Sequence, residues 1–201
     1  MKVICIDGCV GCGKTTLINT LYEMLSKRYK VHVIHEYIDV LSDAQQKLTD
    51  YLSGVITASE FQRYILNYYA SNTYLINDYD YVLVERIPIV GLQFFGKLDV
   101  KNKRLTIDEY NELVTYAKRL TFYPDPTDSK CNTISICTDY MDPSTVADLS
   151  YQLITDNVTD VIMLTATAPT IKQRIIQRGR QCEIEAYTDE YIQYMCQEYY
   201  N

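Results

Sequence analysis

The residues whose types and spacing best fit a chemical task lie near the N-terminus, where the chain reads Gly8-Cys9-Val10-Gly11-Cys12-Gly13-Lys14-Thr15-Thr16. The pattern is G-x-x-x-x-G-K-[ST]. In a loop of this kind, glycines allow consecutive backbone N–H groups to point at an anion, and the N-terminus of the next helix adds its positive dipole. Lys14 would reach the β- and γ-phosphates of a triphosphate, and the Thr15 hydroxyl would bind Mg²⁺. Residues 8–16 are therefore predicted to bind ATP.

The loop has the flanking elements that this motif requires. Val3–Ile6 is an apolar run typical of a buried strand, and apolar residues recur at helical spacing over Leu17–Leu25. A second pattern overlaps the first, because Cys5, Cys9 and Cys12 have a spacing found at some iron–sulfur sites. A cluster would leave the glycines and the lysine unexplained, whereas phosphate binding explains them. We therefore interpret the three cysteines as small apolar residues.

The rest of the chain alternates between strand and helix patterns. Further strands are predicted at residues 30–36, 81–84 and 160–165, and residues 133–137 could form another. Strand, helix and strand in succession form a crossover between parallel strands. We expect one domain over residues 1–201, with a three-layer α/β/α fold around a mainly parallel sheet of about five strands. Ligands bind at the carboxyl ends of such strands, so Glu36 and the pair Glu85-Arg86 should lie near the loop.

Several helices carry their own start signals. Capping boxes at Thr57–Glu60 and Thr106–Glu109 predict helices to about residues 76 and 120. A short helix is expected around residues 48–52, and further helices should begin near residues 143, 168 and 189. Residues 122–132, which include two prolines, are predicted to be a loop.

Composition limits the classes of protein that the chain can belong to. The chain has 47% hydrophobic and 22% charged residues and a net charge of −7, which indicates a globular protein and argues against a nucleic-acid partner. No apolar stretch approaches the ~18 residues that a membrane span needs, and the N-terminus has no secretory signal pattern. Seven cysteines in no framework spacing favour a reducing compartment, such as the cytoplasm.

Beyond the loop, three further groups of residues have characteristic spacings. Glu85-Arg86 is followed by Pro88-Ile89, and Arg174-x-x-x-Arg178-x-Arg180 is followed by Glu183. The third group consists of Tyr51 and Gln62, and the distance between them in the sequence is the characteristic feature. With these motifs the sequence resembles the deoxyribonucleoside kinases, including the herpesvirus thymidine kinases. The resemblance covers residues 2–100 and 160–199, whereas residues 122–157 have no clear counterpart. It implies a P-loop NTPase fold with an arginine-rich lid, which phosphorylates the 5′-hydroxyl of a deoxyribonucleoside with ATP and Mg²⁺.

The resemblance also implies a role for each matching residue. Glu36 would be the base for the 5′-hydroxyl, Arg86 would bind phosphate and the 5′ region, and Glu85 would help Thr15 to hold Mg²⁺. Arg174, Arg178 and Arg180 would close over the phosphates. The nucleoside would contact Gln62 and Phe95 with its base and Tyr51 and Glu183 with its 3′-hydroxyl.

Two departures bear on the choice of base. Gly91 and Tyr69 stand where the deoxycytidine kinase branch has an aspartate and an arginine, which argues against cytidine-type selectivity. Because Gly91 should leave room for a methyl group beside Gln62, we expect thymidine or another pyrimidine deoxynucleoside. Two alternatives stay open: a thymidylate kinase of the same fold, and a P-loop protein that binds nucleotide without turnover. A homodimer is compatible with all three functions.

Overall fold

The computed structural model describes residues 1–72, 78–120 and 129–200, excluding the side chain of Tyr200. Its centre is a five-stranded sheet of order β2-β3-β1-β5-β4, in which every neighbouring pair is parallel. The strands are β1 (Lys2–Gly8), β2 (Val31–Ile34), β3 (Tyr81–Glu85), β4 (Thr133–Cys137) and β5 (Val161–Thr165). The predicted α/β fold with a parallel sheet is confirmed, and residues 133–137 form its edge strand.

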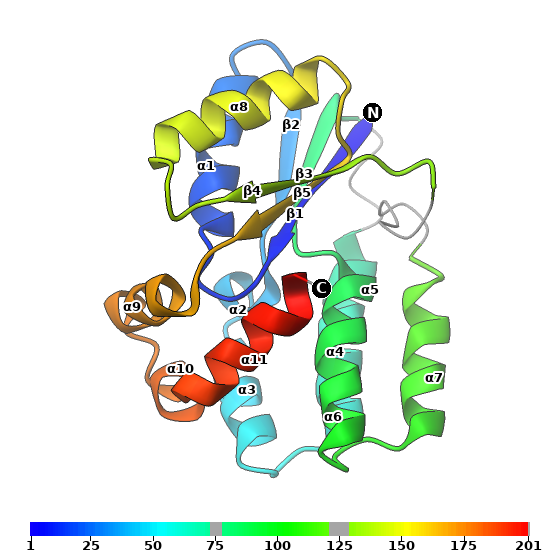
Figure 1. Ribbon diagram of the computed structural model, residues 1–201. Helices are drawn as coiled ribbons and strands as arrows, with labels where there is room; N and C mark the ends of the chain where they lie inside the picture. The colour runs from blue at the N-terminus through cyan, green and yellow to red at the C-terminus, as the bar shows by residue number, and fades with distance from the viewer. Residues whose placement is uncertain (73–77, 121–128, 201) are drawn as a thin grey trace.

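The inner strands are apolar on both faces because helices cover both. Ile4, Cys5 and Ile6 of β1 are completely buried. This continuous apolar pattern is typical of a parallel sheet with two covered faces. On one face, α1 (Lys14–Leu25) packs against α8 (Pro143–Thr155), as Figure 1 shows. On the other face, Tyr68 and Tyr69 of α4 (Ala58–Ser71) share a core cluster with Val82 and Val84 of β3.

The start signals in the sequence correspond to formed caps. Thr57 and Glu60 make both hydrogen bonds of a capping box at the start of α4. Thr106 and Glu109 do the same at α7 (Ile107–Ala117). Each box satisfies two backbone donors that the first helical turn leaves unpaired. The predicted end of the α4 helix, near residue 76, and most of the loop predicted at 122–132 lie outside the described residues.

The helix α9 (Ala168–Arg178) ends before Arg180, the last of the three predicted lid arginines. Gly179 has a φ of 74°, the left-handed conformation of a helix C-cap, and residues Gln181–Ala186 form a separate short helix, α10. The last helix, α11, covers Asp189–Tyr200. Arg180 therefore lies between two helices, and its side chain can point away from those of α9.

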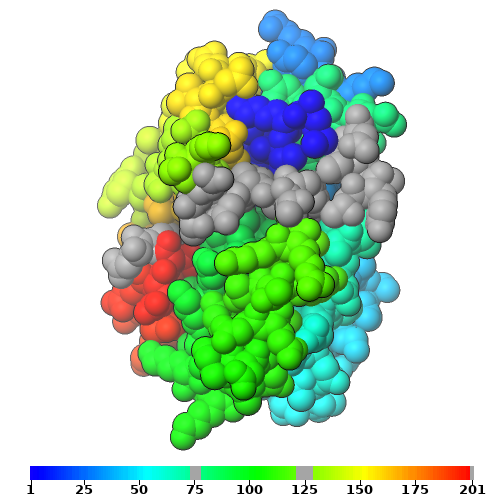
Figure 2. Space-filling view, turned by 90° about the vertical axis from the view of Figure 1, so that its right-hand side faces the viewer, coloured from blue at the N-terminus to red at the C-terminus, as the bar shows by residue number. Residues whose placement is uncertain are grey.

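Three helical regions differ from the prediction. Two of them were not predicted, and the third was predicted only in part. Residues 88–101 form one continuous helix with an irregular centre: α5 (Pro88–Gly91), a π-helical turn (Leu92–Gly96) and α6 (Lys97–Lys101). A one-turn helix, α2 (Tyr37–Val40), follows β2, and α3 (Ala44–Leu52) begins before its expected start. Figure 2 shows one side of the molecule, on which the green residues of α6 and α7 lie below the dark blue N-terminus. Within the described ranges, no helix is long and apolar enough to cross a membrane.

Candidate functional site

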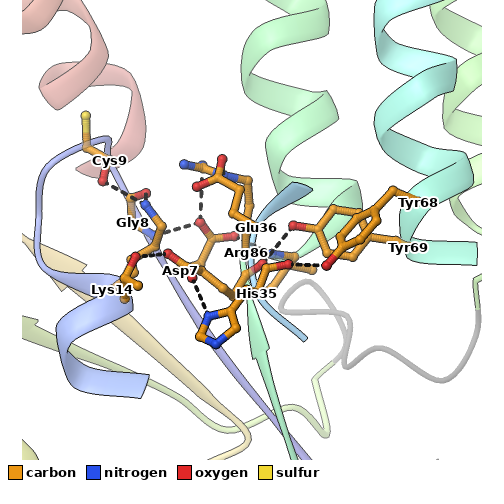
Figure 3. A network of polar contacts seen from close by, with 12 residues as sticks. Asp7, Gly8, Cys9, Lys14, His35, Glu36, Tyr68, Tyr69 and Arg86 are labelled. Carbon is orange, nitrogen blue, oxygen red and sulfur yellow. Dashed lines mark hydrogen bonds and ion pairs between the residues drawn. The ribbon is translucent and has the colours of Figure 1, made fainter. Parts of the chain in front are cut away.

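The phosphate-binding loop connects β1 to α1 and encloses the amino group of Lys14. This side chain is buried, and its Nζ donates to the backbone oxygens of Cys9 at 3.2 Å and Gly8 at 3.4 Å (Figure 3). Gly8 has a φ of 139°, and an added Cβ would lie 2.2 Å from the carbonyl oxygen of Leu164. Only glycine fits at such a position. The predicted loop is therefore formed, with its lysine directed along its inner side.

Asp7 anchors this loop to the neighbouring strand. Its Oδ1 accepts from the N–H of Gly8 at 2.7 Å, and its Oδ2 accepts from the N–H of Ile87 at 2.8 Å. Burial raises the pKa of Asp7, although the charge of Arg86 and the two backbone hydrogen bonds act in the opposite direction. The sequence prediction missed Asp7. Its place directly at the end of a predicted strand was the signal that could have identified it.

Thr15 and Glu85 meet at the start of α1 in an arrangement that fits Mg²⁺. The Thr15 hydroxyl donates to Oε1 of Glu85 at 2.6 Å, and Glu85 is buried. His35 Nδ1 lies 3.4 Å from the other carboxylate oxygen, Oε2. Two oxygen ligands beside a phosphate loop suit Mg²⁺, which usually keeps waters and substrate phosphates as its remaining ligands. The predicted metal-binding residues are thus adjacent to each other.

Glu36 and Arg86 come from the ends of β2 and β3 and form an ion pair. Nε of Arg86 donates to Oε1 of Glu36 at 2.9 Å, and its Nη1 lies 3.6 Å from Oδ1 of Asp7 (Figure 3). Arg86 is buried and has a φ of 70°, a left-handed conformation that is uncommon outside glycine. Its Nη2 is buried without a hydrogen-bond partner among the described residues. A buried guanidinium with a free donor can bind an anion.

Two tyrosines of α4 fix the strand ends that carry these groups. The Tyr68 hydroxyl donates to the backbone oxygen of His35, and that of Tyr69 donates to the backbone oxygen of Glu85, each at 2.7 Å (Figure 3). Tyr69 is completely buried. The residue at which the sequence departs from the deoxycytidine kinase pattern therefore supports the backbone at Glu85 and Arg86.

The three predicted lid arginines lie in two places. Arg174 contacts the phosphate loop, because its Nη1 lies 3.2 Å from the backbone oxygen of Gly11 and 3.0 Å from the hydroxyl of Thr138. Arg178 and Arg180 both donate to the carboxylate of Glu183, and Arg180 also pairs with Asp39. Glu183, which was expected to meet the 3′-hydroxyl, is thus buried and paired with two arginines.

One cavity of about 710 Å³ joins these groups. Every residue that was predicted to bind substrate lines it, as do residues 10–16 of the loop and the three arginines. Gly8 and Cys9 do not line the cavity, although their carbonyl groups contact Lys14. The chain therefore places a phosphate loop, a paired carboxylate and arginine, and a deep apolar-walled compartment around one space.

The compartment away from the loop contains residues that the sequence did not indicate. Asp99 of α6 is buried, and its Oδ1 accepts from the Tyr51 hydroxyl at 2.6 Å. Tyr51 stacks on Phe61 with ring centroids 4.5 Å apart, and Arg104 lies over the ring of Tyr51. Gln62 is buried beside them. Because no motif covers residues 97–104, Asp99 and Arg104 could not be found from spacing.

Gly91 and Phe95 lie on the helix that follows Arg86, and both face its side chain. A Cβ added to Gly91 would be 3.3 Å from Cδ of Arg86. The centroid of the Phe95 ring lies 5.7 Å from Cζ of Arg86. Gly91 therefore leaves space for the arginine, and the sequence argument that it leaves space for a base methyl group loses its physical basis.

The C-terminal helix also reaches the site. Nη1 of Arg86 donates to the hydroxyl of Tyr199, whose ring packs on Phe94 with centroids 4.6 Å apart. Tyr187 and Tyr191 line the cavity from the same end of the chain. In the sequence, the aromatic residues of α11 form an amphipathic pattern. Such a pattern does not indicate which aromatic residue approaches a charged group.

The three cysteines with the iron–sulfur spacing lie in β1 and in the loop that follows it. Cys5, Cys9 and Cys12 are all buried, and burial raises the pKa of the Cys5 and Cys12 thiols. In the part of the chain that the structure describes, no three or more His, Cys, Asp or Glu side chains are grouped to hold a metal ion. The interpretation of these cysteines as small apolar residues agrees with this geometry.

Comparisons with known proteins place the fold. A family model described as an AAA domain matches residues 3–161. A comparison with curated proteins finds no significant sequence match. Among solved structures, the fold is similar to that of the deoxyadenosine kinase from M. mycoides with bound dATP, with TM-score 0.63 and 18% identity over 100% of this chain and 82% of that one.

Two further structures of that protein are similar to the same degree. With the products dCMP and a flexible dCDP bound, the TM-score is 0.61 at 18% identity, covering 100% of this chain and 82% of that one. With bound dCTP, the TM-score is 0.59 at 17% identity, covering 100% and 81%. The matched regions cover the whole chain, and the described residues 129–157, for which the sequence suggested no counterpart, are therefore included. At 17–18% sequence identity, this likeness is evidence of a similar fold alone.

Proposed function

The chain belongs to the AAA-domain family, and on this premise we propose that it transfers the γ-phosphoryl group of ATP to the 5′-hydroxyl of a deoxyribonucleoside. The observation that carries the proposal is the shared cavity. It brings the phosphate loop, the Glu36–Arg86 pair and a compartment of nucleoside size around one space. The likeness in fold to a deoxyadenosine kinase supports the same acceptor class.

In this proposal the donor side is bound by the loop and the arginines. Backbone N–H groups of residues 10–15 and the amino group of Lys14 bind the phosphates, while Arg174 approaches them from α9. Mg²⁺ held between Thr15 and Glu85 would neutralise charge on the phosphate oxygens. Arg178 and Arg180 line the same cavity and would add positive charge, and both also pair with Glu183.

The acceptor side depends on Glu36 and Arg86. Glu36 accepts the proton of the 5′-hydroxyl as that oxygen bonds to phosphorus. Arg86 orients the carboxylate through Nε, and its unpartnered Nη2 can meet the phosphoryl oxygens. The nucleoside fills the compartment between Tyr51, Gln62 and Phe95, with Glu183 near its sugar.

Which base the site prefers is a separate question from which reaction it catalyses. The sequence predicts a preference for thymidine, and this remains a prediction. Its original reason was free space at Gly91. That reason does not hold, because Gly91 faces the side chain of Arg86. Other residues that line the compartment would then decide the base.

The test is an incubation with γ-labelled ATP, Mg²⁺ and either each deoxynucleoside or thymidine monophosphate. We expect label in a deoxynucleoside 5′-monophosphate. Label only in a diphosphate would identify a thymidylate kinase. ATP binding without transfer to any acceptor would identify a nucleotide-binding protein that does not turn over. Lys14→Ala is the matched control, because it should abolish both ATP binding and transfer.

A further inference from the structure

Cys9 of the phosphate loop and Cys196 of α11 form a thiol pair that the proposed reaction does not use. A side-chain hydrogen bond joins the two sulfur atoms. Cys9 is completely buried, whereas Cys196 is half-buried and packs against the core cluster that contains Cys9. The fold therefore brings two cysteines from opposite ends of the chain into direct contact, and solvent reaches one of them.

The hydrogen bond makes the two sulfur atoms chemically different. It raises the pKa of the Cys9 thiol, which keeps its proton as the donor, and burial acts in the same direction. It lowers the pKa of Cys196, the acceptor, although burial and the charge of Asp139 oppose this effect. The thiolate is the reactive form of cysteine. Cys196 is therefore the nucleophile of the pair, and Cys9 is the neighbouring thiol that can react with its oxidised form.

Cys12 is the rival partner for Cys9, because the two residues have a C-x-x-C spacing. The Cys12 sulfur is directed elsewhere. It would lie 2.8 Å from a Cβ added to Gly8, and it accepts a hydrogen bond from the backbone N–H of Lys14. Cys12 is also completely buried, so an oxidant reaches it less readily than Cys196. The geometry therefore favours a reaction between Cys9 and Cys196.

We propose that Cys9 and Cys196 form a peroxide-sensitive modification site, at which a reversible disulfide joins the phosphate loop to the C-terminal helix. The Cys196 thiolate first attacks one oxygen of hydrogen peroxide, the O–O bond breaks, and hydroxide leaves a Cys196 sulfenic acid. Sγ of Cys9 then attacks the Cys196 sulfur, the S–O bond breaks, and the Cys9 proton leaves with that oxygen as water. In total, the two thiols lose two electrons and two protons, and the peroxide becomes two molecules of water. A dithiol reductant reverses the step by thiol–disulfide exchange.

The disulfide should move the phosphate loop more than the helix. Two sulfur atoms that are joined only by a hydrogen bond are farther apart than the about 2.05 Å of a disulfide, so one side must approach the other. The helix α11 is held next to Cys196 by Met195 and Ile192, whose exposed fractions are 0% and 1%. Cys9 lies between the end of β1 and the start of α1 and belongs to neither element. We therefore expect Cys9 to be the residue that moves.

A displacement of Cys9 acts directly on the phosphate-binding loop. The backbone oxygen of Cys9 accepts from Nζ of Lys14 at 3.2 Å and from the N–H of Cys12 at 3.4 Å. These contacts hold the lysine and the loop backbone in place. Because small displacements of positioned groups are costly, we expect the oxidised protein to bind ATP about tenfold or more weakly. This expectation rests on the function proposed above, since it takes ATP as the ligand of the loop.

Peptide mapping tests the modification itself. The reduced protein is treated with a small excess of hydrogen peroxide, the remaining thiols are alkylated, and the proteolytic peptides are analysed by mass spectrometry. We expect one disulfide between the peptides of Cys9 and Cys196, which dithiothreitol removes. A Cys9–Cys12 disulfide, or an oxidised Cys196 without a disulfide partner, overturns the proposal.

Single substitutions test the role of each thiol. Cys196→Ser should prevent oxidation at Cys9, because the buried thiol loses its reactive partner. Cys9→Ala should leave a sulfenic acid at Cys196, which dimedone labels, because the second thiol is absent. Cys137→Ser, a change at another half-buried cysteine, should leave the disulfide unaffected. Equal dimedone labelling of Cys196 in wild type and Cys9→Ala would contradict the role of Cys9, and thermal unfolding checks that each variant is folded.

ATP binding separates this inference from the proposed reaction. The ATP-dependent rise in melting temperature is measured for reduced, oxidised and re-reduced protein, and Cys196→Ser is treated in the same way. We expect the rise to shrink only in oxidised wild type and to return on reduction. If ATP binding responds in this way but no nucleoside is phosphorylated, the proposed reaction is wrong and the inference stands. If phosphorylation occurs and the disulfide leaves ATP binding unchanged, the reaction stands and the role of the disulfide is wrong.

Discussion

Arg86 donates a hydrogen bond from Nε to Oε1 of Glu36 at 2.9 Å, which couples the proposed base to the residue proposed to bind phosphate. Burial alone would raise the pKa of Glu36, but the charges of Arg86 and Lys14 and this hydrogen bond lower it to about 2. Glu36 is therefore ionised at neutral pH but weakly basic. It would accept a proton only as the attacking oxygen bonds to phosphorus and becomes acidic, which suits a loose phosphoryl-transfer transition state.

Glu36→Gln should separate chemistry from binding. Glutamine keeps the size and an acceptor for Arg86 but cannot take a proton at neutral pH, so kcat should fall by ~10²-fold or more. The KM for the nucleoside should stay within a few-fold of the wild-type value. Steady-state kinetics measure both constants, and Glu23→Gln on the exposed side of α1 is the matched control. A near-normal kcat in Glu36→Gln would exclude the base role.

The same ion pair should make stability depend on acid pH. A carboxyl whose pKa is lower in the folded state stabilises the fold above its unfolded value, near 4.5, and loses that contribution as pH falls toward about 2. The difference in free energy of unfolding between wild type and Glu36→Gln should therefore shrink across this window. Urea unfolding at pH 7, 4.5 and 3 measures the difference. A constant difference over the three pH values would contradict the assignment.

Gly91→Ala should slow the reaction with every nucleoside alike. Its Cβ would lie 3.3 Å from Cδ of Arg86, so the arginine must move by a few tenths of an ångström. Because small displacements of a positioned group reduce transfer rates, we expect kcat to fall about tenfold or less. The ratio of kcat/KM for thymidine to that for deoxycytidine should stay constant. A selective loss of thymidine would restore the idea that Gly91 leaves room for the base.

Much of the fold could be predicted because its signals are local. The glycine loop, the apolar strands and the two capping boxes each depend on residues within a few positions of one another, and all of them formed as predicted. The helix over residues 88–101 was missed because its π-helical centre disturbs the 3.6-residue period on which helix prediction relies. Such a turn is stabilised by packing, as at Gly96, where a Cβ would touch Leu92 and Tyr110.

The site could be predicted only as far as motifs extend. Glu36, Glu85 and Arg86 follow strands, so the topology of a parallel sheet brings them to one edge. Asp99 lines the cavity and Tyr199 contacts Arg86, both from segments without a motif, and their contacts cross 48 and 113 residues of sequence. Contacts between residues so far apart in the sequence depend on how the helices pack. Neither the spacing of residues in a motif nor the composition contains that information.

The contact between Arg86 and Tyr199 predicts that the C-terminal helix positions the arginine. The Tyr199 hydroxyl accepts from Nη1, and its ring centroid lies 5.9 Å from Cζ. Because Arg86 also has a left-handed backbone conformation, its side chain depends on such partners for its orientation. Phenylalanine at position 199 would keep the ring against Phe94 but remove the acceptor.

We expect Tyr199→Phe to lower kcat about tenfold, the equivalent of one charge-assisted hydrogen bond, while the KM for ATP stays within a few-fold. Tyr194→Phe is the matched control, since Tyr194 lies on the same helix and contacts Lys101 instead of Arg86. A general role of α11 in folding would change the melting temperature of both variants and leave the kcat of folded protein unchanged. If kcat rises in Tyr199→Phe, the hydroxyl competes with the substrate for Arg86 and does not position it.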